Sequence, residues 1–376
     1  MTQTPSRRTA ALKAYGAGGV VAGALALGMG AARIAEGTRA ALGGRPSDER
    51  LVRIARSPHW RDGAFHNTRA MATMPTDQLG LLRRMRGSRG RRRPSAVVPL
   101  ARPGIPGVSS VPVVTWFGHA SVLVELGGAR ILLDPVWGER CSPSRVAGPK
   151  RVHPVPVPLA ELGPVDAVVI SHDHYDHLDR DTIVELARTA AEFVVPLGVG
   201  AHLEAWGVAP DRVVELDWDE SQTVAGVEVT CVESQHFSGR GVRRDETLWA
   251  SWVLASPSGR VFFSGDTGFF DGYPAMAAAY GPFDVALMAI GAYDPGWHGI
   301  HLDPEEAVRA AVDLGSPLLV PIHWGTFVLA PHPWAEPVER LLPAAGAAGV
   351  RVAVPRPGES VDISAPAPVV AWWRQA

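Results

Sequence analysis

From residue 111 onward, short apolar stretches of strand length alternate with polar, glycine-rich or proline-rich segments. The apolar stretches are rich in Val, Ile and Phe and end at Gly, Pro, Asp or Ser, which is typical of β-strands. The predicted strands are Val111–Thr115, Ser121–Glu125, Arg130–Leu133, Ala167–Ile170, Phe193–Val195, Val227–Val232, Ser251–Ala255, Val261–Phe263, Val285–Ala289 and Leu318–Ile322. Helices are predicted between them at Arg180–Ala191, Ala201–Trp206, Pro304–Leu314 and Pro337–Ala345. This alternation indicates a layered α/β or α+β domain.

Composition and charge refine this picture. The chain has 376 residues, of which 46% are hydrophobic and 20% charged, which excludes a disordered or coiled-coil protein. Two cysteines cannot form a disulfide framework or a cysteine-based zinc site, whereas thirteen histidines can contribute to a metal site. Residues 1–102 hold 19 Lys and Arg against 5 Asp and Glu, so the net negative charge lies in the remainder.

The first 35 residues are predicted to be a targeting segment outside the fold. Ser6-Arg7-Arg8 precedes an uncharged stretch, 14–32, that is rich in Gly and Ala. Paired arginines before a weakly apolar segment are typical of a twin-arginine export signal. We therefore expect the protein to be exported or membrane-anchored at the bacterial cell envelope. The alternatives are an uncleaved anchor or a simple tail, with the protein cytoplasmic and peripheral to the membrane.

Residues 36–110 are predicted to be an N-terminal extension with a basic arm and a linker. Seven arginines fall within residues 83–93, which we call the basic arm, and Leu79, Leu82 and Met85 lie beside them. Such a segment suits an anionic membrane surface, and a solvated linker is the alternative. Nucleic acid is not expected as a partner, because no aromatic residues alternate with the basic ones. Residues 94–110 are expected to connect the arm to a domain spanning 111–376.

A histidine-rich run directly after the strand at 167–170 is the strongest chemical signal. The run reads His172-Asp173-His174-Tyr175-Asp176-His177. Imidazole nitrogens and carboxylate oxygens are the donors that divalent metals prefer. Further candidate ligands follow other strands: His236, Asp266 and His323. Since sites in α/β layers collect beyond the carboxyl ends of strands, we expect these residues to meet the run.

The same positions match a known family. The pattern H-x-H-x-D-H followed by His, G-D-T and I-H-W-G resembles the metallo-β-lactamase superfamily, which has a four-layer αββα sandwich in the α+β class and a two-metal site. The segments at 116–125, 133–137, 142–144, 148–151, 263–268, 290–293, 301–307 and 323–327 are similar to the N-acylphosphatidylethanolamine-hydrolysing phospholipase D family. The resemblance covers about Val111 to Phe327.

The resemblance implies two divalent metal ions, with Zn²⁺ the expected metal and manganese or iron as alternatives. His172, His174 and His236 would hold one ion; Asp176, His177 and His323 would hold the other; Asp266 would bridge them. The alternatives are a hydrogen-bonded structural role for His236 or His323 and a turn-capping role for Asp266. Asp266, Asp176 and His301 are the catalytic candidates.

Residues outside this ligand set receive weaker predictions. His119, His298 and Tyr175 are candidates for substrate binding, with a structural role as the alternative for His119. Asp134 is expected to orient a ligand histidine or to form a plain turn, and Asp173 to face solvent or to be a hydrogen-bonding loop residue. The tryptophans near the motifs, Trp116, Trp137, Trp297 and Trp324, are candidates for an acyl-chain channel or for core packing.

The implied activity is phospholipase D-type hydrolysis of a phospholipid, N-acylphosphatidylethanolamine, which yields N-acylethanolamine and phosphatidic acid. Hydrolysis of another ester, a lactone or a β-lactam is the main alternative, although the best-known β-lactamases have Cys where Asp266 stands. A di-iron redox protein is disfavoured by His174, where such proteins usually have Glu. A non-catalytic membrane scaffold would require broken ligands, and none is broken. The oligomeric state is not predicted.

Overall fold

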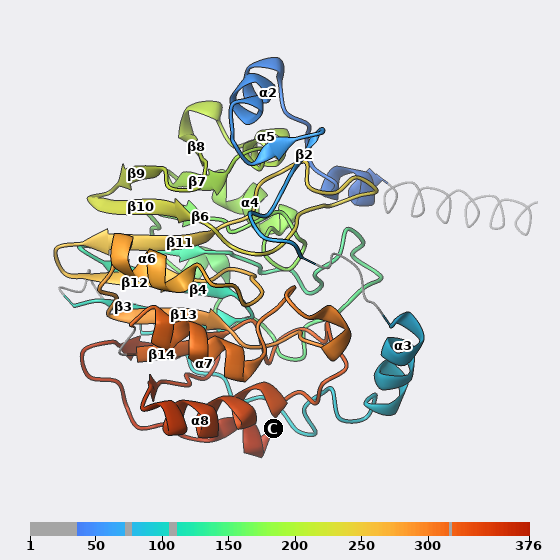
Figure 1. The fold of residues 1–376 in the computed structure, drawn as a ribbon, viewed down its shortest axis with the longest axis vertical. Coiled ribbons are helices and arrows are strands. Elements are labelled where there is room, and N and C mark those ends of the chain that lie inside the picture. The colour runs from blue at the N-terminus through green and yellow to red at the C-terminus, as the bar shows by residue number, and fades with distance from the viewer. Residues whose placement is uncertain (1–35, 72–76, 105–110, 316–317) are drawn as a thin grey trace, which may run out of the picture.

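The structure is a computed structural model that describes residues 36–71, 77–104, 111–315 and 318–376 (Figure 1). Two seven-stranded mixed sheets form its centre. The first has the order β16-β3-β4-β5-β6-β7-β8 and the second the order β15-β14-β13-β12-β11-β10-β9. The strands of the first sheet are β3 (Val113–Gly118), β4 (Ser121–Leu126), β5 (Ala129–Leu133), β6 (Ala167–Val169), β7 (Glu192–Pro196), β8 (Val213–Leu216) and β16 (Ser360–Asp362). Those of the second are β9 (Ser221–Val224), β10 (Val227–Val232), β11 (Ser251–Ser256), β12 (Gly259–Phe263), β13 (Val285–Ala289), β14 (Leu318–Ile322) and β15 (Arg351–Val352).

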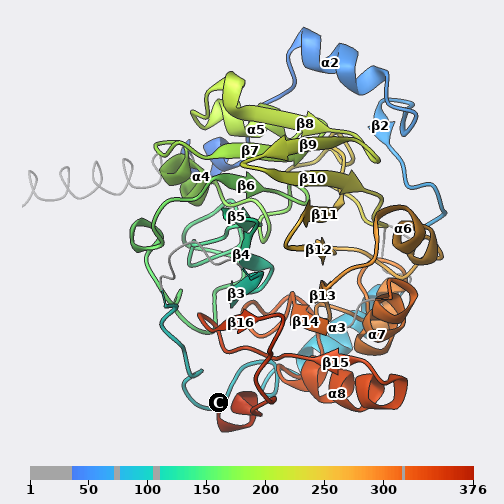
Figure 2. The same cartoon turned by 90° about the vertical axis from the view of Figure 1, so that its left-hand side faces the viewer.

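Helices cover the outer face of each sheet (Figure 2). On the first sheet lie α4 (Arg180–Leu186) and α5 (Gly200–Ala205), and on the second α6 (Tyr273–Tyr280), α7 (Pro304–Asp313) and α8 (Glu336–Ala348). Short 3-10 helices occur at Leu159–Glu161, Pro210–Arg212, Pro295–Trp297 and Trp372–Gln375. The predicted four-layer αββα sandwich is therefore confirmed.

Burial on both faces explains why the strands read as continuous apolar runs. The main core, between the sheets, contains the buried side chains of Trp116, Trp252 and Phe263. A second core, which includes Leu132 and Ile183, joins the first sheet to α4 and α5. Each sheet has an antiparallel and a parallel half. The pairing changes at β5 in the first sheet, where β4–β5 is antiparallel and β5–β6 parallel, and at β12 in the second, where β11–β12 is antiparallel and β12–β13 parallel. The parallel strands end at the same edge, and the candidate ligands follow these ends.

The N-terminal extension contains ordered elements that were not predicted. These are α2 (Asp48–Ala55), β1 (Trp60–Arg61), β2 (Ala64–Phe65) and α3 (Gln78–Gly87). Ile54 and Phe65 are buried in the main core, so residues 36–71 pack against the sandwich. The expected connector is also attached to it, because Val98 is buried and the N–H of Ala101 donates to the carbonyl of Pro357.

Element boundaries differ from the prediction at several points. The helix expected at Arg180–Ala191 ends at Leu186, and the strand expected from Val111 begins at Val113. Strands β8 and β9 and helix α6 were missed because their segments are short and, in β9, largely polar. Among the described residues, no helix is long and apolar enough to cross a membrane. The targeting segment predicted at 1–35 lies outside the described residues.

Candidate metal centre

The candidate ligands gather at one edge of the sandwich, beyond the carboxyl ends of the central strands. The histidine-rich run follows β6, His236 follows β10, Asp266 follows β12, and His323 follows β14. His119 joins them from the turn between β3 and β4. Their side chains form two groups, each of four residues whose ligand atoms lie within 4.8 Å of one another: His172, His174, His236 and Asp266 in the first group, and His119, Asp176, His177 and His323 in the second.

The first group brings three imidazoles together. Nε2 of His172 lies 2.8 Å from Nδ1 of His174, which is 3.3 Å from Nε2 of His236. The rings of His172 and His236 are almost completely enclosed by protein, and His174 is half-buried. Three histidine nitrogens that converge on one point beside a carboxylate are a typical donor set of a divalent metal.

The second group combines a carboxylate with histidines. Oδ2 of Asp176 lies 3.6 Å from Nε2 of His177, 3.4 Å from Nε2 of His323 and 2.9 Å from Nε2 of His119. His119 was predicted to bind substrate or to be structural, and the structure places it in this ligand group. A single sequence could not show this, because His119 lies in a tight β-turn with a positive φ of 53°, more than fifty residues before the run.

Asp266 lies between the two groups. Its Oδ2 is 3.1 Å from Nε2 of His177 and 3.9 Å from Nε2 of His172, and its Oδ1 is 3.0 Å from Nε2 of His323. The carboxylate thus reaches nitrogens of both groups, as a bridging ligand does. The predicted bridging position of Asp266 agrees with this geometry.

The donor set fits divalent ions on its own chemistry. Nε2 of His177, Nε2 of His323 and Oδ1 of Asp266 are buried, and none has a hydrogen-bond partner among the described residues. Buried polar atoms are normally hydrogen-bonded, so several such atoms aimed at one another call for a ligand that accepts nitrogen and oxygen donors together. The predicted pair of metal ions is consistent with these two groups, and imidazole with carboxylate suits zinc, manganese and iron alike.

The pKa values of the ligand histidines shift in both directions, and within the second group burial lowers that of His119 to about 3. Burial and the charge of neighbouring histidines hold the pKa of His172 and His236 well below the ordinary value. Burial alone would also lower the pKa of His177 and His323, but the neighbouring carboxylates of Asp266 and Asp176 together outweigh burial and raise the pKa of His323 to about 9. Protons and metal ions compete for these nitrogens, so metal binding depends on pH.

Surrounding groups orient the ligand histidines. Oδ2 of Asp134 accepts from Nδ1 of His177 at 2.6 Å, and Oδ1 accepts from the backbone N–H of Ser171 at 2.6 Å. Nδ1 of His236 donates to the carbonyl of Ile300 at 3.1 Å. A partner on the distal nitrogen fixes which ring nitrogen faces the metal. The orienting role predicted for Asp134 is therefore supported by its position.

A buried charged cluster behind the histidine-rich run was missed from the sequence. Arg240 donates to the carbonyl of Asp173, within the run, at 2.6 Å and to the carbonyl of Leu178, directly after the run, at 2.8 Å. Asp173 is buried, accepts from the N–H of Gly239, and lies 3.4 Å from Nε2 of His202. Burial alone would raise the pKa of Asp173, but His202 lowers it to about 2. The solvent-facing alternative for Asp173 is therefore wrong, and the loop hydrogen bond is confirmed.

The remaining predicted site residues occupy different surroundings. Nε2 of His301 lies 3.3 Å from Oδ2 of Asp266, while its Nδ1 donates to the carbonyl of Ala292 at 2.6 Å. The side chain of His298 is 88% exposed, and its Nδ1 is 3.9 Å from Glu306. Tyr175 is half-buried, and its hydroxyl donates to the carbonyl of Arg240 at 2.6 Å.

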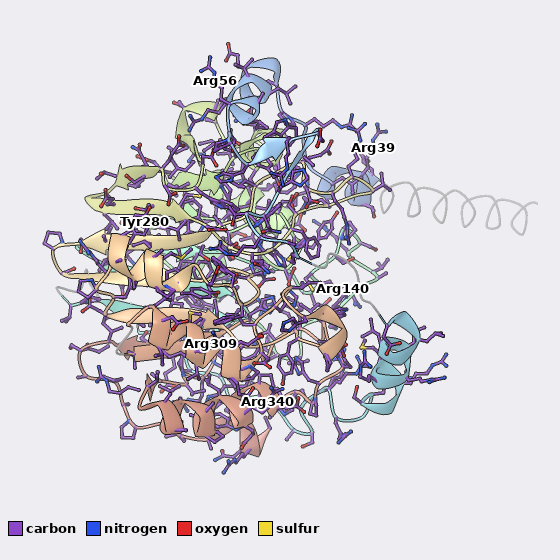
Figure 3. The ribbon with its side chains drawn as sticks, viewed as in Figure 1. Arg39, Arg56, Arg140, Tyr280, Arg309 and Arg340 are labelled. Atoms are coloured by element: carbon purple, nitrogen blue, oxygen red, sulfur yellow. The ribbon has the colours of Figure 1, made fainter. Side chains whose placement is uncertain are left out.

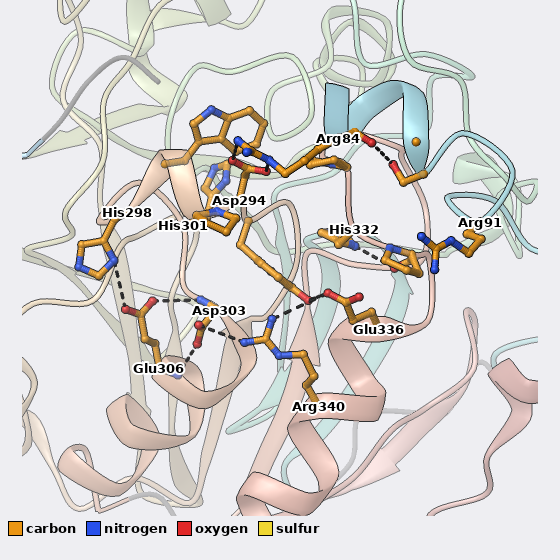
Figure 4. A pocket seen from close by; sticks show the side chains of 17 residues that line it. Arg84, Arg91, Asp294, His298, His301, Asp303, Glu306, His332, Glu336 and Arg340 are labelled. Atoms are coloured by element: carbon orange, nitrogen blue, oxygen red, sulfur yellow. Dashed lines mark hydrogen bonds and ion pairs between the residues drawn. The ribbon is translucent and has the colours of Figure 1, made fainter. Parts of the chain in front are cut away.

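A pocket of about 590 Å³ opens beside the metal centre (Figure 4). His301 lines it, and so do His298, Trp297 and Tyr293. Its other lining residues are mostly charged or polar: Arg84, Ser88, Arg91, Asp294, Asp303, Glu306, His332, Glu336 and Arg340. Helix α3 forms one wall, where Arg84 makes two hydrogen bonds of 2.8 and 2.7 Å to Asp294. Of the tryptophans considered for a channel, Trp116 and Trp324 are buried in the main core instead.

Comparison with known proteins agrees with the fold and the site. The family model described as "Beta-lactamase superfamily domain" matches residues 129–324, more than half of the chain. This chain belongs to the β-lactamase superfamily. An uncharacterized protein of Mycobacterium tuberculosis is 52% identical over 93% of this chain and 96% of its own length. An N-acyl-phosphatidylethanolamine-hydrolyzing phospholipase D of Caenorhabditis elegans is 37% identical over 60% of this chain and 68% of its own length. The solved structure of a metallo hydrolase from the archaeon Ignicoccus hospitalis matches with a TM-score of 0.51 and 24% identity, over 66% of this chain and 97% of its own.

Membership of this superfamily, together with the two ligand groups, identifies the chain as a metal-dependent hydrolase. The family match begins at β5 and ends directly after His323, so it includes every predicted metal ligand. The N-terminal extension and helix α8 lie outside the matched range. These parts are not specific to this chain, because the alignment with the mycobacterial protein covers 93% of it.

Proposed function

We propose that this β-lactamase-superfamily member is a phospholipase D-type phosphodiesterase. Its substrate would be N-acylphosphatidylethanolamine, and its products N-acylethanolamine and phosphatidic acid. The similarity to the nematode phospholipase D, which is 37% identical over 60% of this chain, is the observation that carries the proposal. Aspartate at position 266, rather than cysteine, also supports a reaction other than β-lactam hydrolysis.

The metal centre defines where hydrolysis would occur. His172, His174 and His236 would hold one ion, and Asp176, His177 and His323 the other, with Asp266 between them. Two divalent ions in such a site supply Lewis-acid polarisation of a phosphoryl oxygen and activate water for attack on phosphorus. The enclosed position of these side chains keeps bulk water away from the reacting groups, which strengthens every electrostatic interaction there.

His301 is positioned to move a proton. Its Nδ1–H is committed to the carbonyl of Ala292, so the opposite nitrogen, Nε2, faces Asp266 and the pocket. In the protonated ring, Nε2 can give its proton to the alkoxide of the departing N-acylethanolamine. The water-derived oxygen then remains on the phosphate, and the phosphorus–oxygen bond to the ethanolamine breaks. Asp266 faces this ring, with its Oδ2 3.3 Å from Nε2 of His301.

The pocket lined by His301 would accept the polar part of the substrate. Its charged side chains suit the amide and phosphate groups of the lipid better than an acyl chain. The same polar lining gives weight to a second candidate, the hydrolysis of another ester with a polar leaving group. Product identity separates the two candidates.

Product analysis in ¹⁸O-water tests the proposal. With N-acylphosphatidylethanolamine as substrate, mass spectrometry is expected to find N-acylethanolamine and phosphatidic acid with the label in the phosphate. The variant Asp266→Asn is expected to remain folded and to lose turnover by at least about 10³-fold, because both ligand groups lose their shared carboxylate. Release of fatty acid, or label in any other product, would overturn the phospholipase D assignment.

We also propose that helix α3 contacts an anionic membrane surface. Leu79 and Leu82 are 71% and 58% exposed, and Arg83 and Arg86 lie beside them on the exposed part of the helix. Exposed leucines next to basic side chains are the pattern of a helix that lies in the lipid headgroup region. Because α3 also lines the pocket, this contact would place the lipid near the metal centre.

Sedimentation with phospholipid vesicles tests this contact. The variant Arg83→Glu/Arg86→Glu is expected to bind vesicles containing anionic lipid at least about tenfold more weakly, since each basic residue near the surface contributes about 1 kcal/mol. Hydrolysis of a soluble phosphodiester should be unchanged. Equal loss of both activities would contradict a membrane role for α3.

Export is tested separately, by fractionating cells that express the full chain and its Arg7→Lys/Arg8→Lys variant.

A further inference from the structure

A second pocket, of about 460 Å³, lies where the basic arm meets the hydrolase domain. Its lining residues are Arg89, Arg92, Arg93, Arg140, Gly148, Pro149, Lys150 and Val328. Five of these eight residues are cations, and no carboxylate lines the pocket. The cations come from segments about fifty residues apart, so the pocket exists only because the arm folds against the loop at 140–150. Figure 3 shows Arg140 on the side of the molecule where α3 lies.

Backbone carbonyls hold two of the guanidinium groups in place. Nη1 of Arg140 donates to the carbonyl of Gly148 at 2.6 Å, and Nη2 of Arg92 donates to the carbonyl of Met85 at 3.1 Å. The Nε atoms of Arg92 and Arg140 are buried and have no hydrogen-bond partner among the described residues. Carbonyl oxygens carry no net charge, so these contacts position both groups without compensating their charge.

Most of the positive charge at this pocket is uncompensated. Lys150 is paired with Glu139, whose carboxylate lies 2.5 Å from Nζ. In the part of the chain that the structure describes, the side chains of Arg89 and Arg93 make no hydrogen bond or ion pair. Cations around one small cavity lie well within the Debye length of about 8 Å at physiological salt, so they repel one another. An anion in the cavity would remove this repulsion.

We propose that this pocket is a phosphate-binding site, separate from the metal centre. The planar fork of arginine matches the geometry of phosphate oxygens, and four arginines surround this cavity. The ligand is a phosphate-bearing anion, either the phosphate of an anionic phospholipid headgroup or a free phosphate. Nucleic acid is a poorer fit because no aromatic side chain lines the pocket for base stacking. The site does not depend on the reaction catalysed at the metal centre.

Occupancy of this site would link the arm to the hydrolase domain. A phosphate that contacts Arg89 or Arg93 on one side and Arg140 or Lys150 on the other joins two segments that otherwise repel. The arm is continuous with α3, which lines the pocket beside His301. A ligand at the phosphate site would therefore restrict the motion of α3 beside the substrate pocket.

Isothermal titration calorimetry on the metal-loaded full chain tests the proposal, with inorganic phosphate and soluble dihexanoyl phosphatidic acid as probes at constant ionic strength. We expect one binding event at the metal centre and a second at the phosphate site. The variants Arg89→Gln/Arg93→Gln and Lys150→Gln are expected to weaken only the second event, by about tenfold or more. Arg83→Gln/Arg86→Gln is the control matched to Arg89→Gln/Arg93→Gln, because it removes two charges from the same arm but outside the pocket. It should weaken the second binding event less than about twofold.

The outcomes distinguish a specific phosphate-binding site from non-specific attraction to the positive charge of the arm. Equal weakening by the control and by the pocket variants would overturn the proposal, as would binding to anionic vesicles without any second event for either soluble probe. If dihexanoyl phosphatidic acid binds more tightly than inorganic phosphate, the ligand is a lipid headgroup. If both bind equally, the site takes free phosphate. Either of these last results supports a phosphate-binding site.

Discussion

At the scale of single residues, the metal centre depends on partners that hold each ligand ring at the correct angle. Asp134 is the clearest case, because its side chain is fully buried and contacts both His177 and Ser171. It adopts a positive φ of 39°, which is unusual for a residue other than glycine and places its carboxylate under the histidine-rich run. Burial raises the pKa of Asp134, an effect that His177 partly offsets.

Replacing Asp134 with Asn tests this orienting role. The amide can still contact Ser171, but it no longer stabilises the His177 tautomer whose Nε2 faces the metal. Metal affinity of the group containing His177 is expected to fall about 10–100-fold, the usual effect of losing such a partner. Equilibrium metal competition with a chromophoric chelator measures this change. Asp181→Asn, an exposed substitution nearby, is the control; unchanged affinity in Asp134→Asn would contradict the role.

The metal ligands and Asp134 could be predicted from the sequence, whereas the buried charged residues behind the histidine-rich run could not. His236, Asp266 and His323 could be predicted because each follows a recognisable strand, and parallel strands end at a common edge. Arg240 and His202 gave no such signal: their roles arise from contacts with Asp173 across the fold, and buried charges of this kind look like surface residues in a single sequence.

At the scale of elements, the N-terminal extension is part of the folded structure. On α2, Arg50 pairs with Glu204 at 2.7 Å and with Glu215 at 2.6 Å, which attaches the helix to α5 and β8. Glu215 also accepts from the N–H groups of Gly198 and Gly200. Sequence patterning missed α2 because the helix has only eight residues and its partners lie more than 150 residues away.

The Arg50→Met variant tests how firmly α2 is attached. The side chain of Arg50 is 12% exposed and that of Glu215 10%, so removal of the cation leaves largely buried carboxylates unpaired. The free energy of unfolding is expected to fall by about 3 kcal/mol, measured by urea denaturation of the metal-loaded protein. Arg56→Met, at an exposed position directly after the same helix (Figure 3), should change it by less than about 0.5 kcal/mol. Equal effects of the two variants would contradict the attachment.

At the scale of the whole molecule, two sheets bring distant segments to one edge and place a pocket beside them. The fold was predictable from sequence because strands buried on both faces leave long apolar runs, and because the ligand motifs resemble those of a known superfamily. The position of α3 against Asp294 was not predictable. Arg84 pairs with Asp77 at the start of the same helix, but the partner that attaches α3 to the domain, Asp294, lies 210 residues further along the chain.

The central claim is that two ligand groups joined by Asp266 hold two metal ions. Titration of the metal-free protein with Co²⁺ or Zn²⁺, with metal content confirmed by elemental analysis, tests it most directly. We predict two ions per chain in the native protein, and loss of one or both in Asp266→Asn while circular dichroism shows an intact fold. Binding of no more than one ion by the native chain, or an unchanged two ions in Asp266→Asn, would contradict the account.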